Sequence, residues 1–335
     1  MRGNHRTYRR VPRAAVWAGT GLIAAALLAS GLRWRSEVRS AVATGRPSTP
    51  PERALLLVDT RAGPLLAVVA TGGSAGPAVM TVPAAVSLTI PGQGDGRVKG
   101  LGRLPGPEVA LAISNLLGVW IPHEAITDAA HLAAVVDRAR GVQAFGQARS
   151  GAEIRRMLGR PGSGAELEWQ ETLRGLFEVA AAWRSDDFLG SDDPGAVAVL
   201  LQSAKGASVV GMPTNEAAAG FLLPDPDTLT HVVAARLGGP PEAPIPVIVL
   251  NGSGTPGVGR SVAERLVPGG FRVTVSQNAS SFDHDTTLVL AGSSADRTAA
   301  DRVRELLGVG TVSVAGVPSS LGDVTIVVGR DYQTG

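Results

Sequence analysis

The chain of 335 residues contains no cysteine. This absence excludes disulfide frameworks, zinc sites built from thiolates, cysteine nucleophiles and lipoprotein anchoring through an acylated cysteine. Aromatic residues make up only 4% of the chain, so its core must be built from small aliphatic side chains. An excess of charge of one sign is also missing, because the formal net charge is +2. No chain-wide field therefore indicates binding to nucleic acid.

A strongly apolar run without charge covers residues 14–32, near the N-terminus. As a helix this run spans about 29 Å, close to the ~30 Å hydrocarbon thickness of a bilayer. Five arginines and no acidic residue precede it, so the positive-inside rule predicts that residues 1–13 form a cytoplasmic tail. We expect one transmembrane helix in the cell membrane, with the bulk of the chain extracytoplasmic. The alternative is a cleaved signal peptide that ends at the small residues Ala29-Ser30-Gly31.

Two stretches rich in proline divide the exported part of the chain. Residues 33–52 end in Ser-Thr-Pro-Pro-Glu and are typical of a stiff, solvated linker. Residues 238–244 form a second cluster of Gly and Pro. We therefore expect one domain over residues 53–237 and another over residues 245–335, which is compatible with usual domain sizes.

The first domain mixes strand and helix patterns, which predicts an α/β (α+β) fold. Short aliphatic runs bounded by Gly and Pro indicate strands at 54–58, 65–70, 79–90, 208–210 and 219–223. Apolar residues at helical spacing indicate helices that begin at Pro107 and that cover 131–140, 166–183 and 227–237.

The second domain has a simpler pattern, with the order βαββαββ. The strands are expected at 247–250, 272–275, 287–290, 311–314 and 324–328, and the helices at 259–267 and 296–307. We expect a small, mostly antiparallel sheet with both helices on one face.

Asn251-Gly252-Ser253-Gly254-Thr255-Pro256-Gly257 follows the first of these strands and satisfies G-x-G-x-x-G. A dinucleotide site also needs a parallel βαβ unit and an acid at the end of its second strand. That strand ends in Ser276-Gln277-Asn278 instead. The motif is therefore interpreted as a tight turn whose glycines permit positive φ.

Three segments of the second domain resemble the C-terminal module of LytR-type cell-envelope proteins. They are the opening PVIVLNGSG of residues 246–254, the segment Gly270-Phe271-Arg272-Val273, and the closing DVTIVVGRDY of residues 323–332.

The first domain resembles the LytR-CpsA-Psr (LCP) family in degenerate form. Residues 81–92 fall on the family's Ser-Ile-Pro-Arg-Asp strand and the Ile-Pro-Gly after it, and Asp59-Thr60-Arg61 is similar to the Asp-Ser-Arg that ends its first strand. The resemblance implies transfer of a glycopolymer from an undecaprenyl-pyrophosphate carrier to peptidoglycan. In that reaction arginines hold the pyrophosphate and acids hold Mg²⁺.

Several family positions have lost their charge in this chain. Ala84 and Ala85 replace the Arg-Asp pair, and Glu166 and Trp169 replace the two basic residues of a later helix. The family's second acid has no counterpart between residues 63 and 78. The sequence leaves open whether Arg149, Arg155 or Arg156 fills the remaining arginine positions.

The surviving candidates for ligand binding are two groups of charged residues. Asp59 and Arg61 form either a phosphate or metal corner or an ordinary surface ion pair. Arg97, Lys99 and Arg103 form either a basic cluster for a diphosphate or a solvated loop. Among the histidines, only His284, between Asp283 and Asp285, sits among possible metal ligands, and this segment is more typical of a turn.

We expect a membrane-anchored envelope protein of a high-GC Gram-positive bacterium. The lost charges predict that it has little or no transferase activity. Its expected partner is a polyprenyl-linked glycopolymer, a wall polymer or an assembly protein. The first alternative is an active phosphotransferase that uses Mg²⁺, and the second is a structural partner of an active LCP paralogue.

Overall fold

The computed structural model describes residues 53–160, 165–217, 220–315 and 319–333. The predicted transmembrane helix at 14–32 and the linker at 33–52 lie outside these residues. Within the described ranges, no helix combines the length and the apolar character needed to cross a bilayer. Residues 51–335 form one compact unit.

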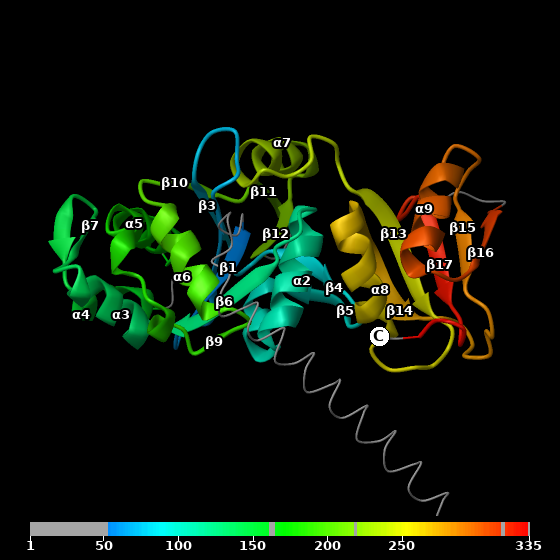
Figure 1. Cartoon of the computed structure of the whole chain (residues 1–335), viewed down its shortest axis with the longest axis horizontal. Helices are drawn as coiled ribbons and strands as arrows, with labels where there is room; N and C mark the ends of the chain where they lie inside the picture. Colours follow the sequence, from blue (N-terminus) through cyan, green and yellow to red (C-terminus); the bar gives the residue numbers. More distant parts are fainter. Residues whose placement is uncertain (1–52, 161–164, 218–219, 316–318, 334–335) are drawn as a thin grey trace, which may run out of the picture. The chain divides into compact units, whose positions relative to one another are not determined.

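A large sheet of mixed direction organises residues 53–211 (Figure 1). The strand order is β10-β3-β2-β1-β6-β9. β1 pairs antiparallel with β2 and parallel with β6, and β10 pairs parallel with β3. The strands are β1 Arg53–Asp59, β2 Leu65–Ala70, β3 Ala78–Val82, β6 His123–Asp128, β9 Gly190–Ser191 and β10 Ser208–Gly211.

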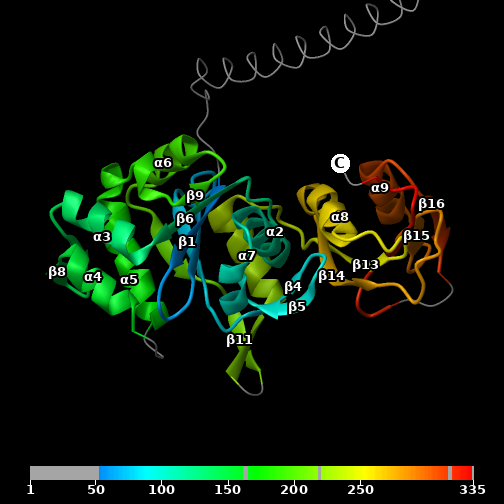
Figure 2. The ribbon, with the colours of Figure 1, turned by 90° about the horizontal axis from the view of Figure 1, so that it is seen from below.

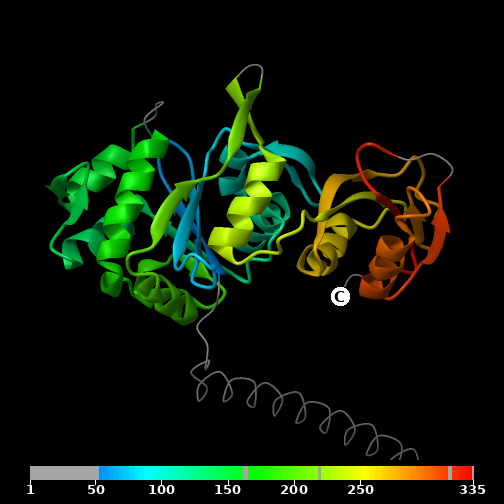
Figure 3. The ribbon, with the colours of Figure 1, turned by 90° about the horizontal axis from the view of Figure 1, so that it is seen from above.

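Both faces of this sheet are covered by helices, which explains why its central strands are continuous aliphatic runs. In β1, Leu56 and Val58 belong to one core cluster and Leu55 and Leu57 to the other, as alternation along a strand requires. The first cluster is completed by α3 Ala129–Arg138, α4 Gly151–Leu158, α5 Ala165–Glu178 and α6 Pro194–Ser203. The second is completed by α2 Gly106–Leu117 and α7 Pro226–Leu237, seen together in Figure 3.

Three hairpins form separate two-stranded sheets outside the large sheet. They are β4 Ser87–Ile90 with β5 Gly94–Arg97, β7 Val142–Ala144 with β8 Gln147–Arg149, and β11 Thr214–Ala217 with β12 Phe221–Pro224. The last projects away from the sheet (Figures 2 and 3). The prediction of a single strand over 79–90 was wrong, because the chain turns at Pro83. Val86 N–H donates to the Pro83 carbonyl (3.1 Å), and Pro83 has no N–H for a ladder.

A small sheet organises residues 245–328, with the order β14-β13-β17-β15-β16. Its elements are β13 Ile245–Asn251, α8 Val258–Leu266, β14 Phe271–Asn278, β15 Leu288–Ala291, α9 Arg297–Leu307, β16 Thr311–Val314 and β17 Val324–Val328. The mixed α/β class and the order βαββαββ are thus confirmed. The expected antiparallel pairing was wrong, because only β15 with β17 runs antiparallel. A helix between consecutive strands favours a parallel crossover, as in β13-α8-β14.

The small sheet is held against α2 by the side chain of Asn115. β14 is the edge strand, and the backbone of Val273 lies opposite Asn115. The Asn115 Nδ2 donates to the Val273 carbonyl (2.8 Å), and the Val273 N–H donates to Asn115 Oδ1 (2.7 Å). The Asn115 amide thus makes the two backbone hydrogen bonds with Val273 that a neighbouring strand would otherwise make. Leu111 of α2 also belongs to the core of the small sheet.

We expect Asn115→Ala to lower the free energy of unfolding by about 2–4 kcal/mol, because it leaves a buried N–H and a buried carbonyl of Val273 without partners. Urea denaturation of wild type and variant measures this loss. The exposed Asn215 of β11 provides a matched control, and Asn215→Ala should change stability by less than about 0.5 kcal/mol. Equal stability of the two variants would contradict the role given to Asn115.

Candidate functional site

The carboxyl ends of four strands meet at one edge of the large sheet. β1 and β6 are parallel, β3 has the direction of β1 because both are antiparallel to β2, and β10 is parallel to β3. Asp59 ends β1 and Asp128 ends β6, and the two are register partners. Two carboxylates therefore stand on adjacent strands at the edge where ligands of α/β sheets commonly bind.

Asp128 also begins α3. Its Oδ1 accepts hydrogen bonds from the backbone N–H of Ala130 (2.9 Å) and of His131 (2.8 Å), and lies 2.9 Å from the His131 Nδ1. The hydrogen bond from the His131 amide is the main cause that lowers the pKa of the Asp128 carboxyl. Asp128 is therefore ionised at neutral pH, and these bonds use one of its two oxygens.

A pocket of about 770 Å³ opens beside the two aspartates. Arg61 enters it from the turn after β1, and Arg155 and Arg156 enter it from α4. α4 is fixed by a reciprocal capping box between Ser150 and Glu153. The remaining lining residues are Thr60, Ala129, Ala130, Ala152 and Gly159.

The charge of this pocket suits a phosphorylated ligand. Among the described residues, no carboxylate lies within 4 Å of the guanidinium groups of Arg61, Arg155 and Arg156. Three arginines without ion pairs can donate paired hydrogen bonds to phosphate oxygens. Mg²⁺ typically binds one or two protein carboxylates together with substrate phosphates and water. Asp59 and the free oxygen of Asp128 fit such an ion.

The other basic candidates do not line this pocket. Arg97, at the end of β5, places its guanidinium 3.6 Å from the ring centroid of Phe221. Lys99 and Arg103 are exposed on the 3₁₀ helix Val98–Arg103. This helix packs against the turn between β1 and β2, since Gly102 lies next to the ring of Pro64.

Ala84, Ala85 and Glu166, three positions that differ from the LCP pattern, lie at the carboxyl end of β3. Ala84 and Ala85 form the turn after this strand, and their carbonyls accept hydrogen bonds from Lys99 N–H and Leu222 N–H. Glu166, at the start of α5, accepts hydrogen bonds from the Thr81 hydroxyl and from Gln170 Nε2. This end of the edge therefore presents methyl groups and a carboxylate, with the exposed Lys99 beside Ala84.

Trp169 belongs to the core. Its side chain is fully buried, and Nε1 donates to the Leu66 carbonyl (3.3 Å). A residue in this environment cannot reach a ligand in water, so Trp169 supports the fold of the edge.

The glycine-rich turn of the small sheet lies next to the turn after β4. Gly254 and Gly257 adopt φ of 74° and 79°, as expected for a tight turn. β13-α8-β14 is a parallel unit, which the sequence analysis did not expect. However, Gly92 packs against Gly259 at the start of α8, and its N–H donates to Ser276 Oγ (2.7 Å). The turn after β4 therefore lines one side of a pocket of about 640 Å³, which Gly257 and Gly259 line from the start of α8.

Within the part of the chain that the structure describes, no group of three or more His, Asp or Glu residues has the geometry of a metal site. The ring of His284 packs against Gly252 instead.

Comparison with known proteins identifies the second domain. Residues 244–332 match the family model described as "LytR cell envelope-related transcriptional attenuator". No curated protein sequence matches the chain.

Solved structures resemble more than half of the chain at low identity. A LytR-Csp2A-Psr enzyme from Actinomyces oris is 17% identical and has a TM-score of 0.44, over 59% of this chain and 93% of that one. The putative transcriptional regulator ywtF from Bacillus subtilis is 13% identical with a TM-score of 0.47, over 58% and 94%. A structure titled LytR-CPS2A-psr family protein YwtF (TagT) with bound octaprenyl pyrophosphate lipid is 14% identical with a TM-score of 0.45, over 56% and 89%.

We expect Asp128→Ala to destabilise the protein by about 1 kcal/mol at pH 7, because it removes the cap of α3. The pKa of this carboxyl is lowered from 3.8 on folding. Its contribution is thus present above about pH 4 and is lost as the pH falls through the folded-state pKa.

Urea denaturation at pH 7 and at pH 3 measures both effects. Asp128→Asn serves as the control, because Asn also caps helices but carries no charge. It should lose less stability than Asp128→Ala at pH 7. A wild-type advantage over Asp128→Asn that grows toward acid pH would contradict the lowered pKa.

Proposed function

Because residues 244–332 form a LytR C-terminal domain, we propose that the chain is a cell-envelope protein that binds a lipid-linked glycopolymer through its diphosphate. Residues 14–32 anchor it in the cell membrane, and the domains lie outside. The similarity of Asp59-Thr60-Arg61 and of residues 81–92 to LCP motifs supports this proposal.

One observation carries the proposal: Asp59 and Asp128 flank a pocket that contains Arg61, Arg155 and Arg156. The arginines bind the non-bridging oxygens of the diphosphate, and the aspartates hold a divalent cation against it. When bound, that cation neutralises phosphate charge. A neutral wall glycan has no groups that require this combination of charges.

We further propose that transferase activity is low. Phosphoryl transfer depends on cations placed around the reacting phosphate. Removing one such donor typically costs about 10²–10³ in rate. Ala84 and Ala85 carry no such donor, and Glu166 adds negative charge at the same end of the edge. The ligand is therefore held more effectively than it is converted.

The active transferase stays as the second candidate because of Asp128. The sequence lacks the family's second acid between residues 63 and 78, and the fold brings Asp128 beside Asp59 from a different strand. In this second candidate Arg155 and Arg156, which line the same pocket, act in place of the missing arginines. This arrangement favours a site whose charged residues come from positions other than those of the family motifs.

Calorimetric titration of the whole chain with pyrophosphate and Mg²⁺ tests the binding site. We expect Arg61→Met and Arg155→Met each to weaken binding about tenfold, since a charge-assisted hydrogen bond contributes about 1.5–3 kcal/mol. Arg304→Met removes the same charge from exposed α9 and should leave the affinity unchanged. Equal effects of all three variants would refute a local site.

Release of phosphate from a polyprenyl diphosphate distinguishes the two candidates. The proposed binder shows less than a hundredth of the rate of an LCP transferase assayed alongside it, with or without Mg²⁺. A comparable Mg²⁺-dependent rate that is lost in Asp59→Asn and Asp128→Asn would establish the transferase instead.

A further inference from the structure

Arg272 is a partly buried arginine next to the C-terminal turn of α2. It lies on edge strand β14, within Gly270-Phe271-Arg272-Val273, and faces the end of α2. Its Nε donates to the Asn115 carbonyl (3.2 Å), and its Nη2 lies close to Gly118. No carboxylate of the described residues is within 4 Å of the guanidinium. Burial lowers the pKa of this group, so folding places an unpaired cation in an unfavourable environment.

Arg272 also lines a pocket of about 200 Å³ between the β4–β5 hairpin, α2 and β14. The lining contains no Asp or Glu: it consists of Ser87, Leu88, Thr89, Asn115, Leu116, Pro224, Arg272, Val273 and Thr274. The hydroxyls of Thr89 and Thr274 donate to backbone carbonyls. The Ser87 hydroxyl and the Nη groups of Arg272 have no such acceptor among the described residues. The free donors of this pocket therefore select an anion.

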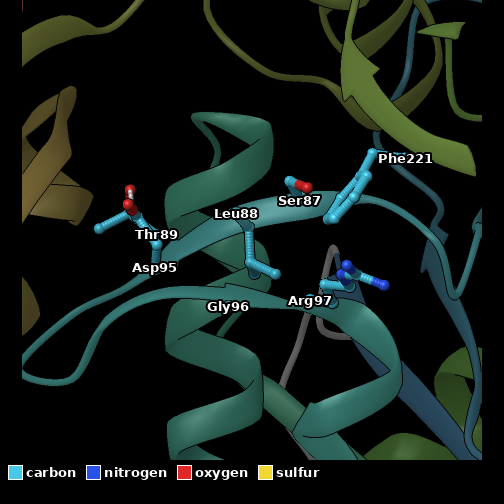
Figure 4. A pocket seen from close by; sticks show the side chains of 7 residues that line it. All are labelled: Ser87, Leu88, Thr89, Asp95, Gly96, Arg97 and Phe221. Atoms are coloured by element: carbon cyan, nitrogen blue, oxygen red, sulfur yellow. Dashed lines mark hydrogen bonds between the residues drawn. The ribbon is translucent and has the colours of Figure 1, made fainter. Parts of the chain in front are cut away.

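A wider pocket of about 460 Å³ adjoins the first and shares Ser87, Leu88 and Thr89 with it (Figure 4). Ser87 pairs with Arg97 and Thr89 with Asp95 across the β4–β5 hairpin, so these four side chains share one face. In Figure 4, Thr89 and Asp95 lie at one end and Arg97 lies beside Phe221 at the other. Carboxylate, hydroxyl and guanidinium groups provide the donors and acceptors that sugar hydroxyls need.

We propose that this junction binds a phosphorylated sugar unit. Arg272 and Ser87 hold the phosphoryl group, and the adjoining face of the β4–β5 hairpin holds the sugar. The planar fork of arginine suits a phosphate dianion or diester, and the partly desolvated site strengthens the contact. The inference rests on the proposed function, because it assigns this second site to the polymer and the Asp59–Asp128 pocket to the diphosphate of its lipid carrier.

Calorimetric titration of the whole chain with glucose 1-phosphate, inorganic phosphate and glucose tests the proposal. Glucose 1-phosphate should bind at least tenfold more tightly than inorganic phosphate, and glucose should bind more weakly than both. Arg272→Met should weaken glucose 1-phosphate binding at least tenfold, whereas Arg304→Met, in the same domain, should not change it. Equal affinities for the two phosphates would show a simple anion site and overturn the sugar assignment.

Thermal unfolding separates binding from a structural role of Arg272. Since Arg272→Met removes a partly buried charge that no carboxylate of the described residues pairs with, its melting temperature without ligand should equal or exceed that of wild type, and added glucose 1-phosphate should no longer raise it. A lower melting temperature with an unchanged ligand-induced shift would overturn the proposal.

Arg61→Met distinguishes the two sites. It should weaken pyrophosphate binding and leave glucose 1-phosphate binding intact, and Arg272→Met should do the reverse. If Arg61→Met alone abolishes both, the second site is refuted and the diphosphate site stands. If Arg272→Met alone abolishes both, the diphosphate assignment fails.

Discussion

The parallel pairing of β1 with β6 is the constraint on which the candidate site depends. Its register sets Asp59 beside Asp128, although 68 residues separate them in the chain. The pairing is held by aliphatic side chains that are buried on both faces of the sheet. A shift of one residue would move every side chain of a strand to the opposite face, so core packing fixes the position of the two carboxylates.

One edge of the large sheet carries both the charged candidate residues and the positions that differ from the LCP pattern. Near β1 and β6 it presents two carboxylates and the arginines of the β1–β2 turn and of α4. Near β3 it presents Ala84, Ala85 and a glutamate that is bonded to Thr81. The arginines near Asp59 and Asp128 are thus gathered at one end of the edge, and Lys99, whose N–H donates to the Ala84 carbonyl, lies at the other.

Much of the fold follows from local patterns, whereas the site does so only in part. β2 and the starts and ends of several helices are marked by aliphatic runs, prolines and glycines, and the sequence predicts them closely. Asp128 was missed because a single acid before a helix is the ordinary signal of an N-cap, and its pairing with Asp59 is a long-range property. The segment from Asp128 to His131 indicates the start of a helix. Only the order of the strands shows that Asp128 lies beside Asp59.

Trp169 and the small sheet show two further limits. The sequence identifies Trp169 as a changed family position, but only the packing shows that it is a core residue bonded to Leu66. Strand direction in the small sheet is set by crossovers through α8 and α9, which short apolar strands do not reveal. The contact of Asn115 with Val273 joins residues 158 apart in sequence, a distance at which no periodic pattern operates.

A crystal of the whole chain soaked with Mn²⁺ and pyrophosphate gives the most direct test of the central claim. The account predicts an anomalous peak between the carboxylates of Asp59 and Asp128, with the diphosphate against Arg61 and Arg155. A manganese ion and diphosphate bound elsewhere, with these side chains unchanged, would contradict it.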